Sequence, residues 1–277
     1  MKTIAVPTDF STCSKNAFDY AVQILKSEGN GKIVLVHVYM PNIEAEYPNF
    51  VPPVADFIKE REETLKDFKE GLLHELGEED LGLFQIEDQF IIGFPAEEIA
   101  EISKDFDLLI MGKTGSSNLM DQLFGSVATA VAAKSQCPVI LIPENGHFGK
   151  IENILFASNY ESVKEDTLEK LALFNETFKA KLHFVHIKEN STDIFINNEK
   201  LIFDEMIQRH QGKFSFQINE IEAESVVDGI NQYSVDNSID LVVLVNFKKP
   251  IWQQIFDRST TKALAFEMKV PLMIYHL

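Results

Sequence analysis

A chain of 277 residues accommodates one large or two ordinary domains, and its 45% apolar residues, with 22 phenylalanines among them, suffice for sizeable cores. The formal net charge of −18 at pH 7 disfavours nucleic acid and anionic membranes as partners, because neutralising their phosphates requires lysine and arginine. This charge does not exclude a small nucleotide, which local backbone amides can hold.

The cysteine content and the first residues bear on the cellular compartment. The two cysteines, Cys13 and Cys137, are too few for a disulfide framework, which favours a reducing compartment. The first residues, MKTIAVPTDFS, lack the long apolar core of a signal peptide, and no apolar run reaches the length of a membrane span. We therefore expect a soluble cytoplasmic protein.

Strands and helices alternate along the first half of the chain. Apolar runs predict strands at residues 4–6, 33–38, 84–92, 108–111 and 139–142. Helical spacing predicts helices at 17–25, with Ser11 or Ser14 as the cap, and at 54–76, 96–104 and 126–134. The run IVLVHV is nearly continuous in apolar residues, which is typical of a strand covered on both faces. The pattern predicts a doubly wound α/β domain.

The same order of elements restarts after residue 150. NILFASNYES (153–162) repeats TIAVPTDFST, LHFVHI repeats IVLVHV, IDLVVLV repeats FDLLIMG, and VPLMIYHL repeats CPVILIP. Because the order is conserved throughout, the chain is an internal duplication. The polar segment PENGHFGK divides it, and we predict domains at residues 1–145 and 150–277.

A glycine loop in the first half predicts a phosphate site. Its glycines follow a buried strand and precede a helix with the spacing G-x2-G-x9-G-S, at Gly112, Gly115, Gly125 and Ser126. Glycines allow a ligand to approach the backbone closely, and a helix N-terminus offers free N–H groups to an anion. Strand, loop and helix together are typical of nucleotide sites at the carboxyl edge of a parallel sheet.

The second half has lost this loop. The three glycine positions hold Val245, Lys248 and Arg258, and Asp9 is replaced by Asn159. Because the second half keeps the strand pattern without the glycines, we interpret the glycines as ligand-binding residues that the fold itself does not require. The expectation is one filled site and one closed site.

These motifs resemble the universal stress protein family. The glycine spacing, the strand-ending PTD, the VHV strand and the terminal PVILIP carry the resemblance, which covers the chain as two tandem domains. The resemblance implies, for each domain, a five-stranded parallel sheet in the order 3-2-1-4-5 flanked by helices. It also implies that residues 139–142 and 272–275, the last strands, pair antiparallel, so that the two domains form an intramolecular pseudo-dimer. Whether a homodimer also forms, and which protein partner is bound, are left open.

The resemblance also implies a ligand and its contacts. Nucleotide-binding members hold ATP at the strand ends, and the ligand here would be ATP, ADP or AMP, with Mg²⁺ as an option. Carried over by position, Asp9 would contact the adenine or ribose, Val38 the adenine through its backbone, and Ser126 the phosphates. The complete implied set is Pro7, Thr8, Asp9, Val38, Met111, Gly112, Gly115, Gly125, Ser126 and Val127.

The expected function is a nucleotide-dependent regulatory module of the stress response, in which the loop at 41–53 orders over the site. One alternative is a nucleotide-free interaction module. Another is slow ATP hydrolysis or autophosphorylation on Ser126, although no general base is evident beside the loop. The GKT at Lys113 is not a Walker A motif, because the first glycine of that motif is absent.

Four other residues invite a chemical role. His37 and His186 lie within apolar strands, and we interpret both as satisfied histidines of the core or sheet face. Cys13, near a helix start, and Cys137 are interpreted as packed thiols.

Overall fold

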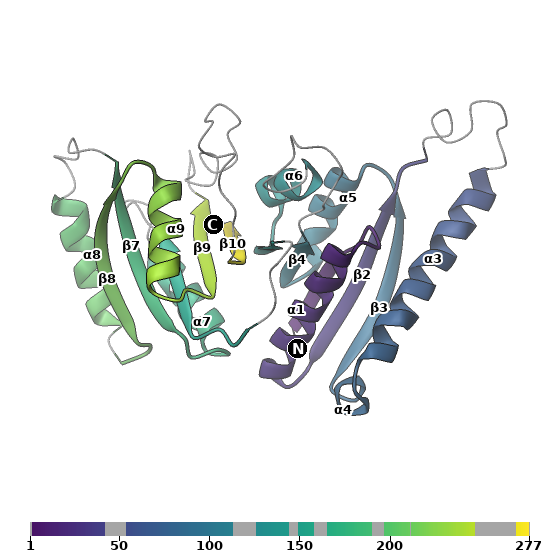
Figure 1. Cartoon of the computed structure of the whole chain (residues 1–277), viewed down its shortest axis with the longest axis horizontal. Helices are drawn as coiled ribbons and strands as arrows, with labels where there is room; N and C mark the ends of the chain where they lie inside the picture. Colours follow the sequence, from purple (N-terminus) through teal and green to yellow (C-terminus); the bar gives the residue numbers. More distant parts are fainter. Residues whose placement is uncertain are drawn as a thin grey trace. The chain divides into compact units, whose positions relative to one another are not determined.

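The structure, a computed structural model, describes residues 2–41, 54–112, 126–143, 149–157, 165–189, 197–210, 212–246 and 270–276. The chain divides into two compact units, Met1–Glu144 and Asn145–Leu277 (Figure 1). Several positions that the sequence analysis singled out lie outside the described residues. They are residues 42–53 of the predicted loop at 41–53, then Lys113, Gly115 and Gly125, and in the second unit Asn159, Lys248 and Arg258.

The first unit is a parallel sheet flanked by helices. Its strands are β1 (Lys2–Pro7), β2 (Gly31–Tyr39), β3 (Phe84–Ile92), β4 (Leu108–Gly112) and β5 (Val139–Ile142), in the spatial order β3-β2-β1-β4-β5. The helices are α1 (Thr12–Glu28), α3 (Val54–Glu75), the short α4 (Glu78–Leu81), α5 (Pro95–Ile102) and α6 (Ser126–Lys134). The predicted order 3-2-1-4-5 is confirmed for this unit.

The second unit repeats this arrangement. Strands β6 (Asn153–Ala157), β7 (Lys181–Glu189), β8 (Phe216–Ala223), β9 (Leu241–Asn246) and β10 (Leu272–His276) lie in the order β8-β7-β6-β9-β10, all parallel. Helices α7 (Glu165–Asn175), α8 (Asn197–Arg209) and α9 (Val226–Asp236) connect them. The predicted pairing of the last strands of the two units concerns the placement of one unit against the other, and it stays a prediction.

The ends of the elements follow local chemistry. Helix α1 begins after Ser11, whose hydroxyl accepts a hydrogen bond from the Ser14 amide, so Ser11 is the cap. Gly29, with a φ of 83°, ends the helix in the left-handed region that glycine tolerates. Helix α5 begins at Pro95, one residue earlier than predicted, because proline suits the first helical position. It ends at Ile102, and a 3₁₀ turn over Ser103–Asp105 takes up the remainder.

Right-handed crossovers set the helix layers. In the first unit they put α1 and α3 on one face of the sheet and α5 and α6 on the other (Figure 1). In the second unit, Phe184 of β7 packs on Phe203 of α8, whereas its neighbour His183 contacts Tyr233 of α9. Successive residues of a strand point to opposite faces, so α8 and α9 cover opposite faces of that sheet. Among the helices of the described segments, none has the length and apolarity to cross a membrane.

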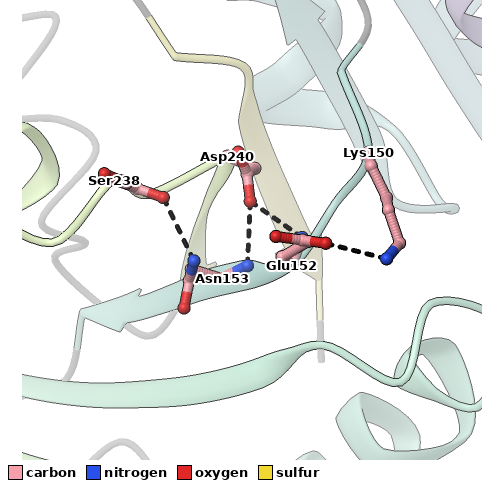
Figure 2. A network of polar contacts seen from close by, with 5 residues as sticks. All are labelled: Lys150, Glu152, Asn153, Ser238 and Asp240. Carbon is pink, nitrogen blue, oxygen red and sulfur yellow. Dashed lines mark hydrogen bonds and ion pairs between the residues drawn. The ribbon is translucent and has the colours of Figure 1, made fainter.

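An aspartate clamps the start of the first strand in both units. In the first unit, Asp107 accepts a hydrogen bond from the Thr3 amide at 2.7 Å. In the second, one carboxylate oxygen of Asp240 accepts from the amides of Glu152 at 2.8 Å and Asn153 at 2.9 Å (Figure 2). The repeated Asp in FDLLIMG and IDLVVLV therefore has a structural role, because it satisfies strand-end amides with a charged acceptor.

An ion pair also recurs, with its charges reversed. In the first unit Lys15 of α1 lies 2.5 Å from Glu75, the last residue of α3. In the second unit Glu165, which corresponds to Lys15 in the repeat, lies 3.7 Å from Arg209, the last residue of α8. The same two helices are thus joined in each unit, by opposite polarities.

The aspartate clamps can be tested by truncation. We expect Asp240→Ala to lower the free energy of unfolding by about 1–2 kcal/mol, because two amides lose a charged acceptor at the surface. Asp107→Ala, which frees one amide, should cost less, about 1 kcal/mol. Urea denaturation measures both. Glu63→Ala, which removes only an exposed pair with Lys59, is the control, and a control loss as large as that of Asp240→Ala would contradict the clamp.

Candidate functional site

The carboxyl ends of the central strands form the candidate site of the first unit. Strand order reverses between β1 and β4, which pair through Ile4 with Leu108 and Ala5 with Leu109. Parallel sheets bind ligands at this kind of reversal, outside the strand ends. Four of the predicted contacts lie at this edge: Pro7 and Gly112 are the last residues of β1 and β4, and Val38 and Met111 are the last but one of β2 and β4. All four are buried, so they offer a ligand mainly their backbone groups.

The turn from β1 into α1 is braced by hydrogen bonds. The Thr8 amide donates to the Val36 carbonyl at 2.8 Å, and the Thr8 hydroxyl donates to the Ser14 hydroxyl at 2.9 Å. The Phe10 amide donates to the Thr8 hydroxyl oxygen at 3.0 Å. Thr8 is thereby fixed at both its backbone and its side chain, and it serves the turn as a structural residue.

Asp9 is exposed at the tip of this turn. One carboxylate oxygen, Oδ1, accepts from the amide and the hydroxyl of Ser11, at 3.1 and 2.5 Å. The other, Oδ2, accepts no hydrogen bond within the described part of the chain. Asp9 is therefore oriented by Ser11, the true helix cap, and still offers a charged acceptor to a hydroxyl or amino group of a ligand.

Gly112 has a packing role that the sequence analysis missed. A Cβ at this position would lie 2.1 Å from the carbonyl oxygen of Cys13 and 2.9 Å from its Cβ. No real contact is that short, so only glycine lets the end of β4 meet the first turn of α1. The interpretation that the fold does not require the glycines is therefore wrong for Gly112 in the first unit.

Helix α6 begins at Ser126, as predicted. The first amides of any helix lack intrahelical acceptors and carry the positive end of the helix dipole, so this terminus is chemically suited to phosphate. Val127, also predicted as a contact, is half-buried in the first turn. Gly115 and Gly125 stay predictions, since the loop before α6 lies outside the described residues.

The cysteines and histidines fulfil their expected roles in part. Cys13 and Cys137 are both buried, as predicted, and burial raises the pKa of Cys137 to about 11, which keeps this thiol protonated. His186 is buried. His37 donates from Nδ1 to the Thr8 carbonyl at 2.8 Å, but its Nε2 is buried without a partner in the described segments, so it is satisfied at one nitrogen alone. Within the same segments no group of three or more His, Cys, Asp or Glu side chains could hold a metal ion.

The second unit contains a buried polar network that no sequence motif indicated. His183 lies 3.0 Å from the Tyr233 hydroxyl through Nδ1 and 3.1 Å from Asn153 Oδ1 through Nε2. Gln217 and Asn219 donate to the Tyr233 hydroxyl at 2.7 and 2.8 Å. The Gln217 amide nitrogen also lies 2.8 Å from Nδ1, and because it can only donate, Nδ1 is an acceptor. His183 then donates from Nε2 to Asn153, and this arrangement requires a neutral ring. The only sequence signal was a histidine within an apolar strand.

Comparisons with known proteins identify the family. The model of the universal stress protein family matches residues 1–143, and the chain belongs to this family. The resemblance inferred from the glycine loop and the strand motifs is thereby confirmed.

Two relatives from Methanocaldococcus jannaschii match half of the chain. Universal stress protein MJ0577 is 33% identical over 156 residues, which are 51% of this chain and 94% of that protein. Universal stress protein MJ0531 is 32% identical over 146 residues, 51% of this chain and 81% of that protein. The crystal structure of a universal stress protein from Archaeoglobus fulgidus shares the fold: it covers 99% of this chain and 96% of its own, with a TM-score of 0.73 at 18% identity.

The close contact at Gly112 predicts that adding one methyl group there lowers the stability of the protein substantially. We expect Gly112→Ala to lower the free energy of unfolding by about 3 kcal/mol or more, because the methyl group meets backbone atoms that cannot turn aside. Gly71→Ala in α3 is the matched control, since nothing lies within 4 Å of its added Cβ. The control should stabilise the protein by up to about 1 kcal/mol through helix propensity. Similar effects of both substitutions in urea denaturation would contradict the close contact.

The His183 network predicts a loss of stability in acid. Burial lowers the pKa of His183, and Lys181 lowers it further. The folded state therefore binds its proton less readily than the unfolded state, whose pKa is about 6.5, and stability falls as pH drops below that value. We expect the free energy of unfolding to fall by about 1 kcal/mol between pH 7 and pH 5 through this group.

Comparing the wild type with His183→Asn isolates this effect, because other groups titrate alike in both proteins. Urea denaturation at each pH, followed by far-UV circular dichroism, measures the free energy of unfolding. His74→Asn removes an exposed histidine of α3 and serves as the control. A difference between the wild type and His183→Asn that does not change with pH would contradict a neutral, buried His183.

Proposed function

We propose that the first unit binds ATP, or a related adenine nucleotide, across the carboxyl ends of β1, β2 and β4, and that this binding is a regulatory input of a stress response protein. The observation that carries the proposal is the rigid turn at the β1–β4 reversal, which presents Asp9 with one carboxylate oxygen unused. Family membership supports the same reading, because the intact glycine spacing lies within the matched residues 1–143.

The proposed contacts divide by chemistry. Asp9 accepts hydrogen bonds from the ribose hydroxyls or the adenine amino group, because a carboxylate is an acceptor alone. The backbone of Val38 meets the adenine, and Met111 and Gly112 line the ribose. The phosphates are held by backbone amides and one hydroxyl, from Gly115, Gly125, Ser126 and Val127. Mg²⁺, if bound, would supply positive charge that offsets the charge of the phosphates.

A regulatory role follows from the difference between the two units. Only the first has the glycine spacing and Asp9, so one chain has one site of this kind. A nucleotide changes the surface that a partner meets only if it binds two conformations with different affinity. We also propose that β5 and β10 pair, since each is the outermost strand of its own unit and a free strand edge invites pairing.

Two measurements test the binding itself. Mass spectrometry of small molecules released from the purified protein should recover an adenine nucleotide. Titration calorimetry with ATP, ADP and AMP, each with Mg²⁺ and with EDTA, should then rank the phosphate number and the metal requirement. Recovery of no nucleotide together with no heat for any of the three would favour a nucleotide-free interaction module.

Asp9 is the sharpest single-residue test. We expect Asp9→Ala to weaken nucleotide binding about tenfold or more, because a hydrogen bond to a charged acceptor is lost. Ser11→Ala removes the helix cap and the hydroxyl that donates to Asp9, and it should weaken binding less than Asp9→Ala because the Ser11 amide still orients the carboxylate. Asn159→Ala changes the corresponding position of the second unit. The proposed role fails if Ser11→Ala weakens binding as much as Asp9→Ala, or if Asp9→Ala leaves it unchanged.

A further inference from the structure

His37 lies directly beneath the turn that carries Asp9. Its Nδ1 donates to the carbonyl oxygen of Thr8 at 2.8 Å, since a carbonyl can only accept. Thr8 makes a second hydrogen bond to β2, because its amide donates to the carbonyl oxygen of Val36. The amide and the carbonyl of Thr8 are thus both hydrogen-bonded to residues of β2. Asp9 is the next residue in the chain, so these two bonds also position Asp9.

Aromatic rings hold the imidazole in place. The Phe10 ring centroid is 4.4 Å from that of His37, and the Phe90 centroid is 5.8 Å away. Phe10 also packs edge-on against Phe68 of α3 at 5.5 Å. The backbone of Phe10 has a φ of 67°, an unfavourable conformation for this residue that persists only because the surrounding contacts stabilise it.

We propose that His37 is a positioning residue of the nucleotide site: its neutral imidazole fixes the Thr8 carbonyl, and thereby the turn that presents Asp9 to the ligand. This inference rests on the proposed function and names a regulation of the same site. His37 touches no part of the ligand in this scheme and acts through Thr8 and Phe10.

The surroundings require the ring to be neutral. Nε2 is buried and has no partner in the described segments, so a proton there would place a charge among aromatic rings. Among the described residues, the charged groups that act on the ring are Arg61 of α3 and Asp9 of the turn. Burial is the largest influence and lowers the pKa of His37; the Thr8 carbonyl raises it, Arg61 lowers it and Asp9 raises it, and the net direction is downward.

Acid therefore opens the turn. With the turn closed the pKa of His37 lies below its ordinary value, and with the turn open the ring is free to take a proton near pH 6.5. Nucleotide binding that needs the closed turn is fully present above about pH 6.5 and weakens as pH falls toward the lowered pKa. The weakening between pH 7.5 and pH 5.5 should reach up to about tenfold.

Three variants test the inference by calorimetry with ATP across this pH range. His37→Leu loses the donor and should bind about three- to tenfold more weakly at pH 7.5. His37→Asn keeps a nitrogen donor at the place of Nδ1, so it should bind ATP with most of the wild-type affinity at pH 7.5. Its affinity should not show the fall in acid that protonation of His37 causes in the wild type. His186→Asn, at the corresponding strand position of the second unit, should match the wild type. Ratios of variant to wild-type affinity at each pH cancel the titration of the nucleotide itself.

Hydrogen exchange at the Phe10 and Ser11 amides gives a readout that needs no ligand, because both amides bond within the turn. Exchange should be faster in His37→Leu than in the wild type. If the wild-type protein binds no nucleotide at pH 7.5, the proposed function is overturned. The exchange measurement then tests only whether His37 stabilises the turn. Unchanged affinity, an unchanged pH profile and unchanged exchange in His37→Leu overturn the inference while the proposed function stands.

Discussion

The approach of β4 to the first turn of α1 is the constraint on which the rest of the first unit depends. Because Gly112 meets the carbonyl of Cys13 with no room for a Cβ, the helix must begin close above the strand ends. The connection from β1 to α1 is therefore short, and it closes through hydrogen bonds of Thr8, Asp9 and Ser11. The same short segment, the turn from β1 into α1 with the end of β4, therefore both packs the core and shapes the candidate site.

The sequence predicted the architecture well because apolar runs and helix boundaries are local signals. The strand at residues 84–92 and the helix at 126–134 have the predicted ends, since turn residues and a terminal lysine flank them. The duplication also predicted that both units share one strand order. The first helix begins directly after Ser11, one of the two caps predicted, and five residues before the stretch of apolar helical spacing. Its first turn, around Cys13 and Ser14, packs against the end of β4 without following a clear apolar period.

What the sequence could not predict depends on contacts between distant residues. The sequence shows that both motifs contain the aspartate, but it does not show which groups the aspartate binds. That became evident only from the structure, in which the starts of β4 and β9 lie beside those of β1 and β6. The same holds for His183, whose partners come from three other elements, and for Gly112, whose neighbour is about a hundred positions away. A glycine in a ligand motif can therefore be retained for packing, and the motif alone cannot separate the two reasons.

The reversed ion pairs favour docking of each helix on its partner from the same unit over docking on the corresponding helix of the other unit. During folding of a duplicated chain, α1 could dock against α8, or α7 against α3, since the scaffolds are alike. Those exchanged pairings would bring Lys15 against Arg209 and Glu165 against Glu75. Each native pair is worth less than about 1 kcal/mol at the surface, but an exchange replaces two attractions with two repulsions. A duplication that kept identical charges would have no such discrimination at this position.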